Sequence, residues 1–361
     1  MTSRDWAASG AADPQRDRIA SLISSAIRSL KLDLRGRVVV TEAATGPYCT
    51  TPIIAAMAGS PRVIALTRES RHGSIDEVLR QTGEMARHCG VASQIEVRVD
   101  RREEWFQEAD VVTNLGFVRP IDAVTSGWMR PGSVVPLMCE AWEWRSADLD
   151  LRACRDRGIQ VFGTNEDHPK VLVFDYCGWL ALKLLLEAGL EGHKTRVLVV
   201  GPDNFARVIV ARLAAAGAVV SHILTLQEDG ARPANGEFDA VIIADYHREG
   251  FVIGPGGAME SPAFVSRFGP VTVIPFVGQV DVAGLQALGV RVFPPENVGS
   301  QRMVRTLAAL GPRPVIDLHA AGLKVGALAL SGETAAAGEF EGLAQPLQVP
   351  SRPPVGPPVQ P

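Results

Sequence analysis

VLVVGPDNFARVIVARLAAAGAVV, residues 197–220, has the pattern of a buried strand, a tight turn and a helix. Dinucleotide-binding folds use this order of elements, with a G-x-G-x-x-G/A turn that receives a pyrophosphate. Here the first and third positions of that turn are Gly201 and Ala206, and the middle position is Asp203. The stretch therefore predicts a Rossmann-like domain with an altered turn.

Asp203 admits two interpretations. A carboxylate beside a pyrophosphate repels it by about 4 kcal/mol at a separation of about 4 Å and an effective dielectric constant of about 20. An aspartate directly before a helix also serves as an N-cap, because it accepts hydrogen bonds from the free N–H groups of the first turn. If the turn does bind NAD or NADP, the predicted cofactor-binding residues are Gly201, Asp203, Asn204, Phe205, Ala206, Thr225 and Asp245.

Short β-branched runs alternate with helical segments on both sides of this stretch, which is typical of parallel sheets covered by helices. We predict an α/β protein with two Rossmann-like or flavodoxin-like parallel-sheet domains separated by a cleft. The predicted parts are an N-terminal helical segment (1–35), a substrate-binding α/β domain (36–170), a dinucleotide-binding domain (171–312), a segment returning to the first domain (313–335), and a proline-rich disordered tail (336–361). Residues 311–330, GPRPVIDLHAAGLKVGALAL, are expected to begin as a strand or extended piece and continue as a helix.

Net charge, apolar runs and cysteine content limit which partners, metals and cellular locations the sequence predicts. The 361 residues carry a net charge of -4 without a basic block, so nucleic acid is not an expected partner. The sequence shows no signal peptide and no apolar run long enough to cross a membrane. Five cysteines without a CxxC pair favour neither a disulfide framework nor a zinc site, so we expect a cytoplasmic protein without a metal.

The stretch from 148 to about 290 resembles the D-2-hydroxyacid dehydrogenases in the order and spacing of its segments. The resemblance implies NAD(P)-dependent oxidation or reduction of a small acid, and a homodimer formed through the second domain. In that family an Arg-Gly pair follows the strand that corresponds to 271–276, whereas this sequence has Val277 and Gly278. The region that carries the family's catalytic histidine, 292–303, contains no histidine.

Two consecutive strand-to-helix turns in the first domain carry groups that suit an anion. Helix N–H groups, hydroxyls and guanidinium groups bind carboxylates and phosphates at the carboxyl edge of such sheets. Capped helices and solvated arginines are the alternative at these positions. The predicted substrate-binding residues, including two asparagines after later strands, are Thr45, Gly46, Thr50, Thr51, Arg68, Arg71, Asn114 and Asn165.

Glu140 and His168 follow two further strands, and we predict that they form the acid–base pair of a catalytic site. His247 follows a strand of the second domain and is a third candidate catalytic residue, with an exposed loop position as the alternative. His319 and Lys324 are expected near the junction of the two domains. Parallel strands deliver their carboxyl ends to one side of a sheet, so the first-domain candidates should share one edge.

Two hypotheses about function remain open at the level of sequence. The first is an NAD(P)-dependent oxidoreductase that acts on a small amino or hydroxy acid. The second is a non-catalytic ligand-binding or accessory biosynthetic protein with a degenerate dehydrogenase fold, because Asp203 and Val277 replace residues that the resemblance requires.

Overall fold

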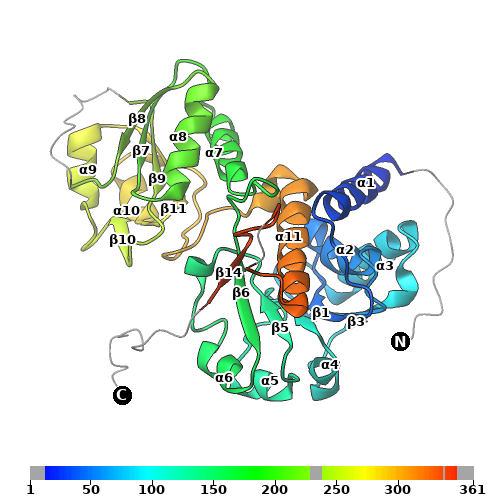
Figure 1. Cartoon of the computed structure of the whole chain (residues 1–361). Coiled ribbons are helices and arrows are strands. Elements are labelled where there is room, and N and C mark those ends of the chain that lie inside the picture. Colours follow the sequence, from blue (N-terminus) through cyan, green and yellow to red (C-terminus); the bar gives the residue numbers. More distant parts are fainter. Residues whose placement is uncertain (1–12, 228–237, 336–337, 348–361) are drawn as a thin grey trace. The chain divides into compact units, whose positions relative to one another are not determined.

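The computed structural model describes residues 13–227, 238–335 and 338–347, and it divides into two compact units (Figure 1). Unit 1 comprises Met1–Leu172 and Pro312–Pro361, and unit 2 comprises Val173–Gly311. Each unit is built around its own mainly parallel sheet. The two α/β domains predicted from the alternating pattern are confirmed, whereas the cleft between them stays a prediction.

Unit 1 contains a seven-stranded sheet in the order β14-β6-β5-β4-β1-β2-β3. All neighbours in it are parallel except β14, which pairs antiparallel with β6. The inner strands are almost wholly buried because helices cover both faces, which explains their continuous apolar sequences. The strands are β1 (Val38–Glu42), β2 (Arg62–Leu66), β3 (Ile95–Arg98), β4 (Val111–Val112), β5 (Val134–Pro136), β6 (Gln160–Thr164) and β14 (Ala344–Pro346).

Two apolar clusters lie on opposite faces of the unit 1 sheet. One packs β-strand side chains against α1, α2, α3 and α11, and the other packs them against the segments that contain α4, α5 and α6. Burying each Val, Leu or Ile side chain contributes about 1.5–3 kcal/mol. The helices are α1 (Pro14–Ser29), α2 (Thr50–Met57), α3 (Ile75–His88), α4 (Glu103–Gln107), α5 (Ala123–Trp128), α6 (Leu151–Asp156) and α11 (Pro312–Ser331), with short 3-10 helices η1 (Gly46–Cys49), η2 (Ala92–Gln94) and η3 (Ala141–Glu143).

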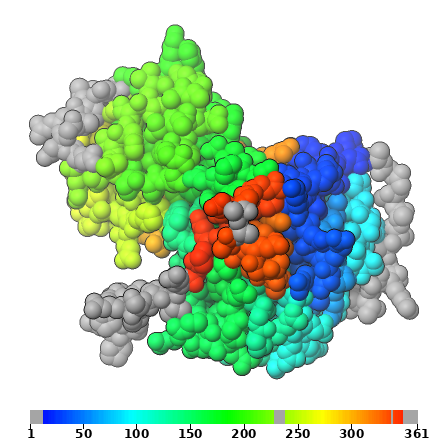
Figure 2. Space-filling view, viewed as in Figure 1, coloured from blue at the N-terminus to red at the C-terminus, as the bar shows by residue number. Residues whose placement is uncertain are grey.

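Helix α11 differs from the prediction at its start. The expected extended piece before the helix is wrong, because the helix begins at Pro312 and runs without interruption to Ser331. Prolines are compatible with a first helical turn, since the N–H groups there have no partner within the helix. In unit 1 α11 packs on α1, α2, β5 and β6. Figure 2 shows its orange residues at the surface beside the blue residues of α1.

The prediction of a disordered tail from residue 336 is wrong for residues 338–347. This segment crosses beside α11 and forms β14 on the edge of the sheet (Figure 1). Leu343 and Ala344 are buried against Val325 and Leu328 of α11. The tertiary contact therefore orders a segment whose own sequence lacks a strand pattern, and residues 336–337 and 348–361 lie outside the described residues.

Unit 2 contains a five-stranded parallel sheet in the order β13-β11-β9-β7-β8, and β10 pairs with β12 in a small second sheet. Strand β9 is fully buried, as expected for the middle of such a sheet. The elements are α7 (Asp175–Glu187), β7 (Arg196–Val200), α8 (Asn204–Ala215), β8 (Val219–Ile223), β9 (Ala240–Ala244), β10 (Phe251–Ile253), α9 (Ser261–Phe268), β11 (Thr272–Val277), β12 (Gln279–Val280), α10 (Val282–Ala287), β13 (Arg291–Val292) and η4 (Leu307–Leu310).

All five cysteines are free thiols. Over the ranges that the structure describes, no helix is both long and apolar enough to span a membrane.

Candidate functional site

The carboxyl ends of β1 and β4 form the topological switch point of the unit 1 sheet. From β1 the chain continues to β2 and β3 on one side, and it then crosses to β4, β5 and β6 on the other. Open α/β sheets bind ligands at such a point, outside the carboxyl ends of the strands. Glu42 ends β1 and Asn114 follows β4, so both residues belong to this edge.

Glu42 holds the loop that follows β4. Its buried carboxylate accepts a hydrogen bond from the backbone N–H of Phe117 at 2.9 Å. Burial raises the pKa of Glu42, and the loop N–H groups and the nearby guanidinium groups of Arg119 and Arg68 oppose that rise. Arg119 is itself fixed by an ion pair with Asp148 at 2.7 Å. The guanidinium group of Arg119 is therefore held in a fixed position beside the switch point.

Asn114 joins the ends of β4 and β5. Its side-chain oxygen accepts a hydrogen bond from the Met138 N–H at 2.8 Å, and its amide group lies 3.8 Å from the Cys139 sulfur. Both ends of the amide thus contact the protein itself. In this structure Asn114 shapes the edge of the sheet and offers little of its side chain to a ligand.

Glu140 connects three segments of unit 1. One of its carboxylate oxygens accepts a hydrogen bond from the Glu166 N–H at 2.7 Å, and the other accepts one from the Gln345 amide at 2.7 Å. Its own N–H donates to the Glu143 carboxylate at 3.2 Å, which completes a capping box at η3. Burial raises the pKa of Glu140, and the two accepted hydrogen bonds oppose that rise.

A group of acidic side chains surrounds Cys139 at the ends of β5 and β6. Burial raises the pKa of Glu143 to about 7 and that of Glu166 well above its usual value, and the negative charges of neighbouring carboxylates add to both. The Cys139 thiol has a raised pKa, mainly because it is buried, and it is influenced by Glu143, Glu166 and the Arg119 guanidinium. Two carboxyl groups and one guanidinium group therefore act electrostatically on this buried thiol, which stays protonated at neutral pH.

His168 is buried in the loop after β6, and its Nδ1 accepts a hydrogen bond from the Lys170 N–H at 3.2 Å. Burial lowers the pKa of His168, and a hydrogen bond with the backbone of Glu341 opposes that change. Within the described part of the chain no hydrogen bond joins His168 to Glu140. The structure places the two predicted catalytic residues in adjoining loops without forming the direct pair that we expected.

The hydroxyls of the predicted anion site are engaged within the protein. Those of Thr45 and Thr50 donate to backbone carbonyl oxygens at 2.8 Å and 2.6 Å. The buried Thr51 hydroxyl is hydrogen-bonded to Nδ1 of His319 at 2.6 Å, so it ties α2 to α11. The side chain of Asn165 likewise donates to the Gly342 carbonyl at 3.0 Å. These four side chains hydrogen-bond within unit 1, and the hydroxyls of Thr45, Thr50 and Thr51 do so without capping the start of a helix.

The two arginines of the predicted substrate-binding residues, Arg68 and Arg71, are accessible to solvent. Arg68 is exposed with its guanidinium carbon 5.4 Å from the centre of the Phe117 ring, and Arg71 is exposed with its Nε 3.1 Å from the His72 ring nitrogen. The N–H of Gly46 donates to the Gln81 side chain at 2.7 Å. Arg68 therefore stays in the candidate site, because it lies near both Glu42 and the loop after β4.

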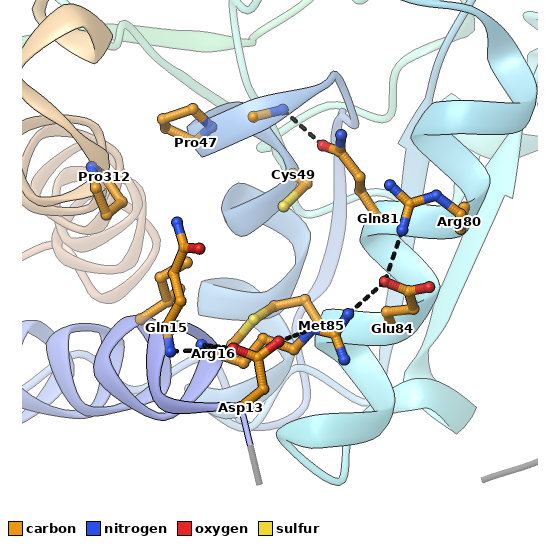
Figure 3. Close-up of a pocket in the computed structure, with 12 residues that line it drawn as sticks. Asp13, Gln15, Arg16, Pro47, Cys49, Arg80, Gln81, Glu84, Met85 and Pro312 are labelled. Carbon is orange, nitrogen blue, oxygen red and sulfur yellow. Dashed lines mark hydrogen bonds and ion pairs between the residues drawn. The ribbon is translucent and has the colours of Figure 1, made fainter. Parts of the chain in front are cut away.

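A pocket of about 330 Å³ opens next to Gly46, between α1, η1 and α3 (Figure 3). Its charged groups already have partners: Arg16 pairs with Asp13 and Glu84, and Arg80 pairs with Glu84. None of the predicted catalytic residues lines it. The lining residues are Asp13, Gln15, Arg16, Ile19, Gly46, Pro47, Cys49, Arg80, Gln81, Glu84, Met85 and Pro312.

In unit 2, Asp203 occupies the N-terminus of α8 as its N-cap. One carboxylate oxygen accepts a hydrogen bond from the Phe205 N–H at 3.0 Å, and the other accepts one from the Tyr246 N–H at 2.9 Å. The backbone of Ala206 contributes a further hydrogen bond, and burial raises the pKa of Asp203. The N–H groups that would face a pyrophosphate therefore face the protein's own carboxylate.

The small residues of the turn serve packing within unit 2. A Cβ at Gly201 would lie 1.8 Å from the Ala244 carbonyl oxygen, so glycine is needed for β7 and β9 to approach. Ala206 is fully buried against the sheet. Phe205 is buried in an aromatic group with Phe174 and Tyr246, at ring-centre distances of 4.8 Å and 5.7 Å.

The remaining predicted cofactor residues also contact their own chain. The Thr225 hydroxyl accepts a hydrogen bond from a backbone N–H at 3.4 Å, and the Asn204 side chain accepts one from a guanidinium group at 2.6 Å. Asp245 is buried, and this burial raises its pKa. His247, which was predicted as a catalytic residue with an exposed loop position as the alternative, is exposed, and its ring lies 5.5 Å from that of Tyr246.

The turn before α8 does not fit a dinucleotide whose pyrophosphate is bound at the helix N-terminus, as the G-x-G-x-x-G/A turn binds it. The helix N-terminus is capped by a fixed anion, and a second phosphate group there would meet like charge. At the position of the family's arginine, Val277 is fully buried in the core of unit 2. The described residues also contain no group of three or more His, Cys, Asp or Glu side chains arranged to hold a metal ion.

Comparison with solved structures identifies the fold. A dipicolinate synthase chain from Bacillus subtilis is 10% identical, with 84% of this chain and 99% of that chain covered and a TM-score of 0.52. Its counterpart from Bacillus halodurans is 12% identical (80% and 96% covered, TM-score 0.49), and NAD-dependent formate dehydrogenase from Staphylococcus aureus in complex with NAD is 11% identical (80% and 99% covered, TM-score 0.44). No protein-family model matches the sequence, and no curated protein is significantly similar to it.

The chain shares the two-domain α/β fold of the dipicolinate synthase chain from Bacillus subtilis, with one mainly parallel sheet in each unit. Identities this low establish the fold alone, because one fold supports many functions. Unit 2 is accordingly Rossmann-like in fold.

Arg119, Glu143 and Gln345 of the unit 1 site were not among the predicted residues. Arg119 lies in the loop after β4, Glu143 ends η3, and Gln345 lies in the segment predicted to be disordered. The proximity of Arg119 and Glu143 to predicted strand ends is the one signal that could have indicated them. Nothing in the local sequence indicates the contact between Gln345 and Glu140, which are separated by 205 positions.

Proposed function

We propose that this protein binds a small amino or hydroxy acid at the carboxyl edge of the unit 1 sheet, as a ligand-binding protein with a degenerate dehydrogenase fold. The observation that carries this proposal is that Glu143, Glu166 and the Arg119 guanidinium all act electrostatically on the buried Cys139. A small zwitterion carries an amine and a carboxylate, which complement these two signs of charge. Arg68 near Glu42 adds further positive potential for the ligand carboxylate.

The burial of Glu143 and Glu166 favours an amine as one group of the ligand. Burial is the main cause of the raised pKa values of Glu166 and Glu143, and the charges of neighbouring carboxylates add to both. A ligand ammonium placed between them would supply the missing positive charge and would lower both pKa values. A hydroxy acid would instead favour the protonated form of one carboxyl, which can donate a hydrogen bond. Binding of the two ligand classes should therefore differ in pH dependence.

Calorimetric titration with a panel of small amino and 2-hydroxy acids tests the proposal. The expected result is binding that weakens about tenfold or more in Glu166→Gln and Glu143→Gln, since charged hydrogen bonds contribute about 1.5–3 kcal/mol. Glu103→Gln is the matched control, because this exposed glutamate of α4 contacts Gln107 and is not among the acidic side chains around Cys139. Absence of binding by the whole panel, or equal affinity in all variants, contradicts the proposal.

A second candidate function is NAD(P)-dependent oxidation or reduction of the same acid. The resemblance of residues 148 to about 290 to the D-2-hydroxyacid dehydrogenases favours it. The capped turn at Asp203 weighs against it. Titration with NAD(H) and NADP(H) separates the candidates, because an oxidoreductase must bind one of these pairs, whereas the ligand-binding protein need not. Homodimerisation through unit 2 and a cytoplasmic location remain predictions.

A further inference from the structure

The C-terminal segment 338–347 is a structural part of unit 1. Strand β14 pairs with β6 in the register Ala344 to Thr164, Gln345 to Gly163 and Pro346 to Phe162. The Leu347 N–H donates to the Val161 carbonyl at 3.1 Å and extends the pairing. Ion pairs of Glu339 with Lys31 and Lys170 fix the start of the segment.

The loop after β6 is attached to this segment. The N–H of Asn165 donates to the Leu343 carbonyl at 2.9 Å, and its side-chain amide donates to the Gly342 carbonyl at 3.0 Å. His168, further along the same loop, interacts with the backbone of Glu341. The loop that carries Glu166 therefore has its position set by residues from the far end of the chain.

Gln345 links that segment to the other loop of the site. Its side-chain amide donates to Glu140 at 2.7 Å, while its side-chain oxygen accepts from the Ala141 N–H at 2.9 Å. A Cβ at Gly163 would lie 2.4 Å from the Ala141 nitrogen, so the glycine lets η3 lie directly against β6 beside Gln345. The close approach and the bidentate contact together fix the backbone from which Glu143 projects.

The hydrogen bonds of Glu140 show how the Gln345 side chain affects the position of Glu166. The Glu166 N–H and the Gln345 amide each donate to one carboxylate oxygen of Glu140, and the backbone of Asp167 contributes a further hydrogen bond. Loss of the Gln345 amide removes a side-chain donor from this buried carboxylate, which favours protonation of Glu140. A protonated Glu140 is a weaker acceptor for the Glu166 N–H. Loss of the Gln345 amide therefore weakens the hydrogen bond between Glu140 and the Glu166 N–H.

We propose that Gln345 is a positioning residue of the unit 1 site, which holds Glu140 so that the two loops bearing Glu143 and Glu166 keep their relative geometry. The role of this geometry in binding an acid rests on the proposed function. The positioning itself does not, so it can be measured on the protein without any ligand.

The experiment uses the full chain and the variants Gln345→Met and Gln345→Glu. Gln160→Met is the matched control, because Gln160 is an exposed residue of β6. Carboxyl carbon NMR of glutamate-labelled protein, assigned with Glu140→Gln, gives the pKa of Glu140, and amide hydrogen exchange gives the protection of the Glu166 and Ala141 N–H groups.

In Gln345→Met we expect the Glu140 pKa to be higher by about 1 and both N–H groups to exchange about tenfold faster, from the loss of charged hydrogen bonds. Gln345→Glu keeps an acceptor for Ala141 but faces Glu140 with a second carboxylate. It should therefore raise the Glu140 pKa while the Ala141 N–H keeps its protection. Gln160→Met should match the unmodified protein in every measurement.

An unchanged Glu140 pKa with unchanged protection in Gln345→Met overturns the proposal. So does a loss of protection spread equally over the strands of unit 1, because Gln345 would then act on overall stability. Should Gln345→Met not fold, Gln345→Glu decides alone through the contrast between Glu140 and Ala141. Failure of all acids to bind, with the Gln345 effects intact, contradicts the proposed function and leaves the positioning role standing.

Discussion

Replacing Asp203 by glycine should destabilise unit 2 and open the N-terminus of α8 to a phosphate. The carboxylate accepts hydrogen bonds from the N–H groups of Phe205 and Tyr246 at 3.0 Å and 2.9 Å. Glycine is itself an acceptable N-cap, so the loss at the helix is a few tenths of a kcal/mol. The buried Tyr246 N–H loses its acceptor, which costs about 1–3 kcal/mol.

Dinucleotide affinity should change in the opposite direction. Removing a charge about 4 Å from a phosphate relieves about 4 kcal/mol of repulsion, which corresponds to roughly three powers of ten in Kd. Asp203→Asn is the matched control, since it removes the charge but keeps a side-chain oxygen and the same volume. It should recover part of the affinity and retain most of the stability.

Urea unfolding followed by circular dichroism and calorimetric titration with NAD(H) and NADP(H) measure both effects. We expect the unmodified protein to show no binding at millimolar dinucleotide and Asp203→Gly to be less stable by about 1–3 kcal/mol. A variant as stable as the unmodified protein would refute the reasoning about the Tyr246 contact. Tight binding by the unmodified protein that weakens in Asp203→Gly would show that the aspartate is part of a working cofactor site.

Three further predictions concern unit 1. Gly163→Ala should destabilise it by about 1–3 kcal/mol in urea unfolding, because the added Cβ would lie 2.4 Å from the Ala141 nitrogen, and an unchanged midpoint contradicts this. His319, hydrogen-bonded to Thr51, has a pKa lowered to about 3 by burial, so its contribution to stability is complete above pH 6.5 and is lost as the pH falls from there towards 3. His319→Gln should therefore lose less stability on acidification, by up to about 1.4 kcal/mol per pH unit. Glu143 has a pKa raised to about 7, so its contribution is complete below pH 4.5 and is lost as the pH rises to about 7. Glu143→Gln should flatten the pH dependence of the free energy of unfolding over that interval, and an unaltered slope contradicts the assignment.

Local sequence patterns predicted most of the elements. The apolar runs that precede Glu42, Asn114 and Gly201 form strands because central parallel strands are buried on both faces and need apolar side chains throughout. Asp203 was also interpretable from its place directly before a helix, and the structure favours the N-cap interpretation over a pyrophosphate contact. Local sequence therefore predicts those helices, strands and caps that depend on short-range hydrogen bonds and on periodic burial of apolar side chains.

The candidate site was predicted in part. Glu140 was expected at the edge of the sheet because strand ends of a parallel sheet meet there, and it does lie after β5. Its expected partner His168 forms no hydrogen bond with it in the described structure. The distance between two loops depends on how the strands are ordered and how the helices pack, and neither is contained in the pattern of one segment.

The sequence by itself determined the two α/β domains and the altered turn at Asp203, since these follow from local periodicity and residue type. The tertiary structure alone decided that Gln345 contacts Glu140 and that His319 contacts Thr51, across 205 and 268 positions. Such contacts form where packing brings a free donor to a buried acceptor. A segment such as 344–346 therefore becomes a strand because an unpaired sheet edge lies beside it.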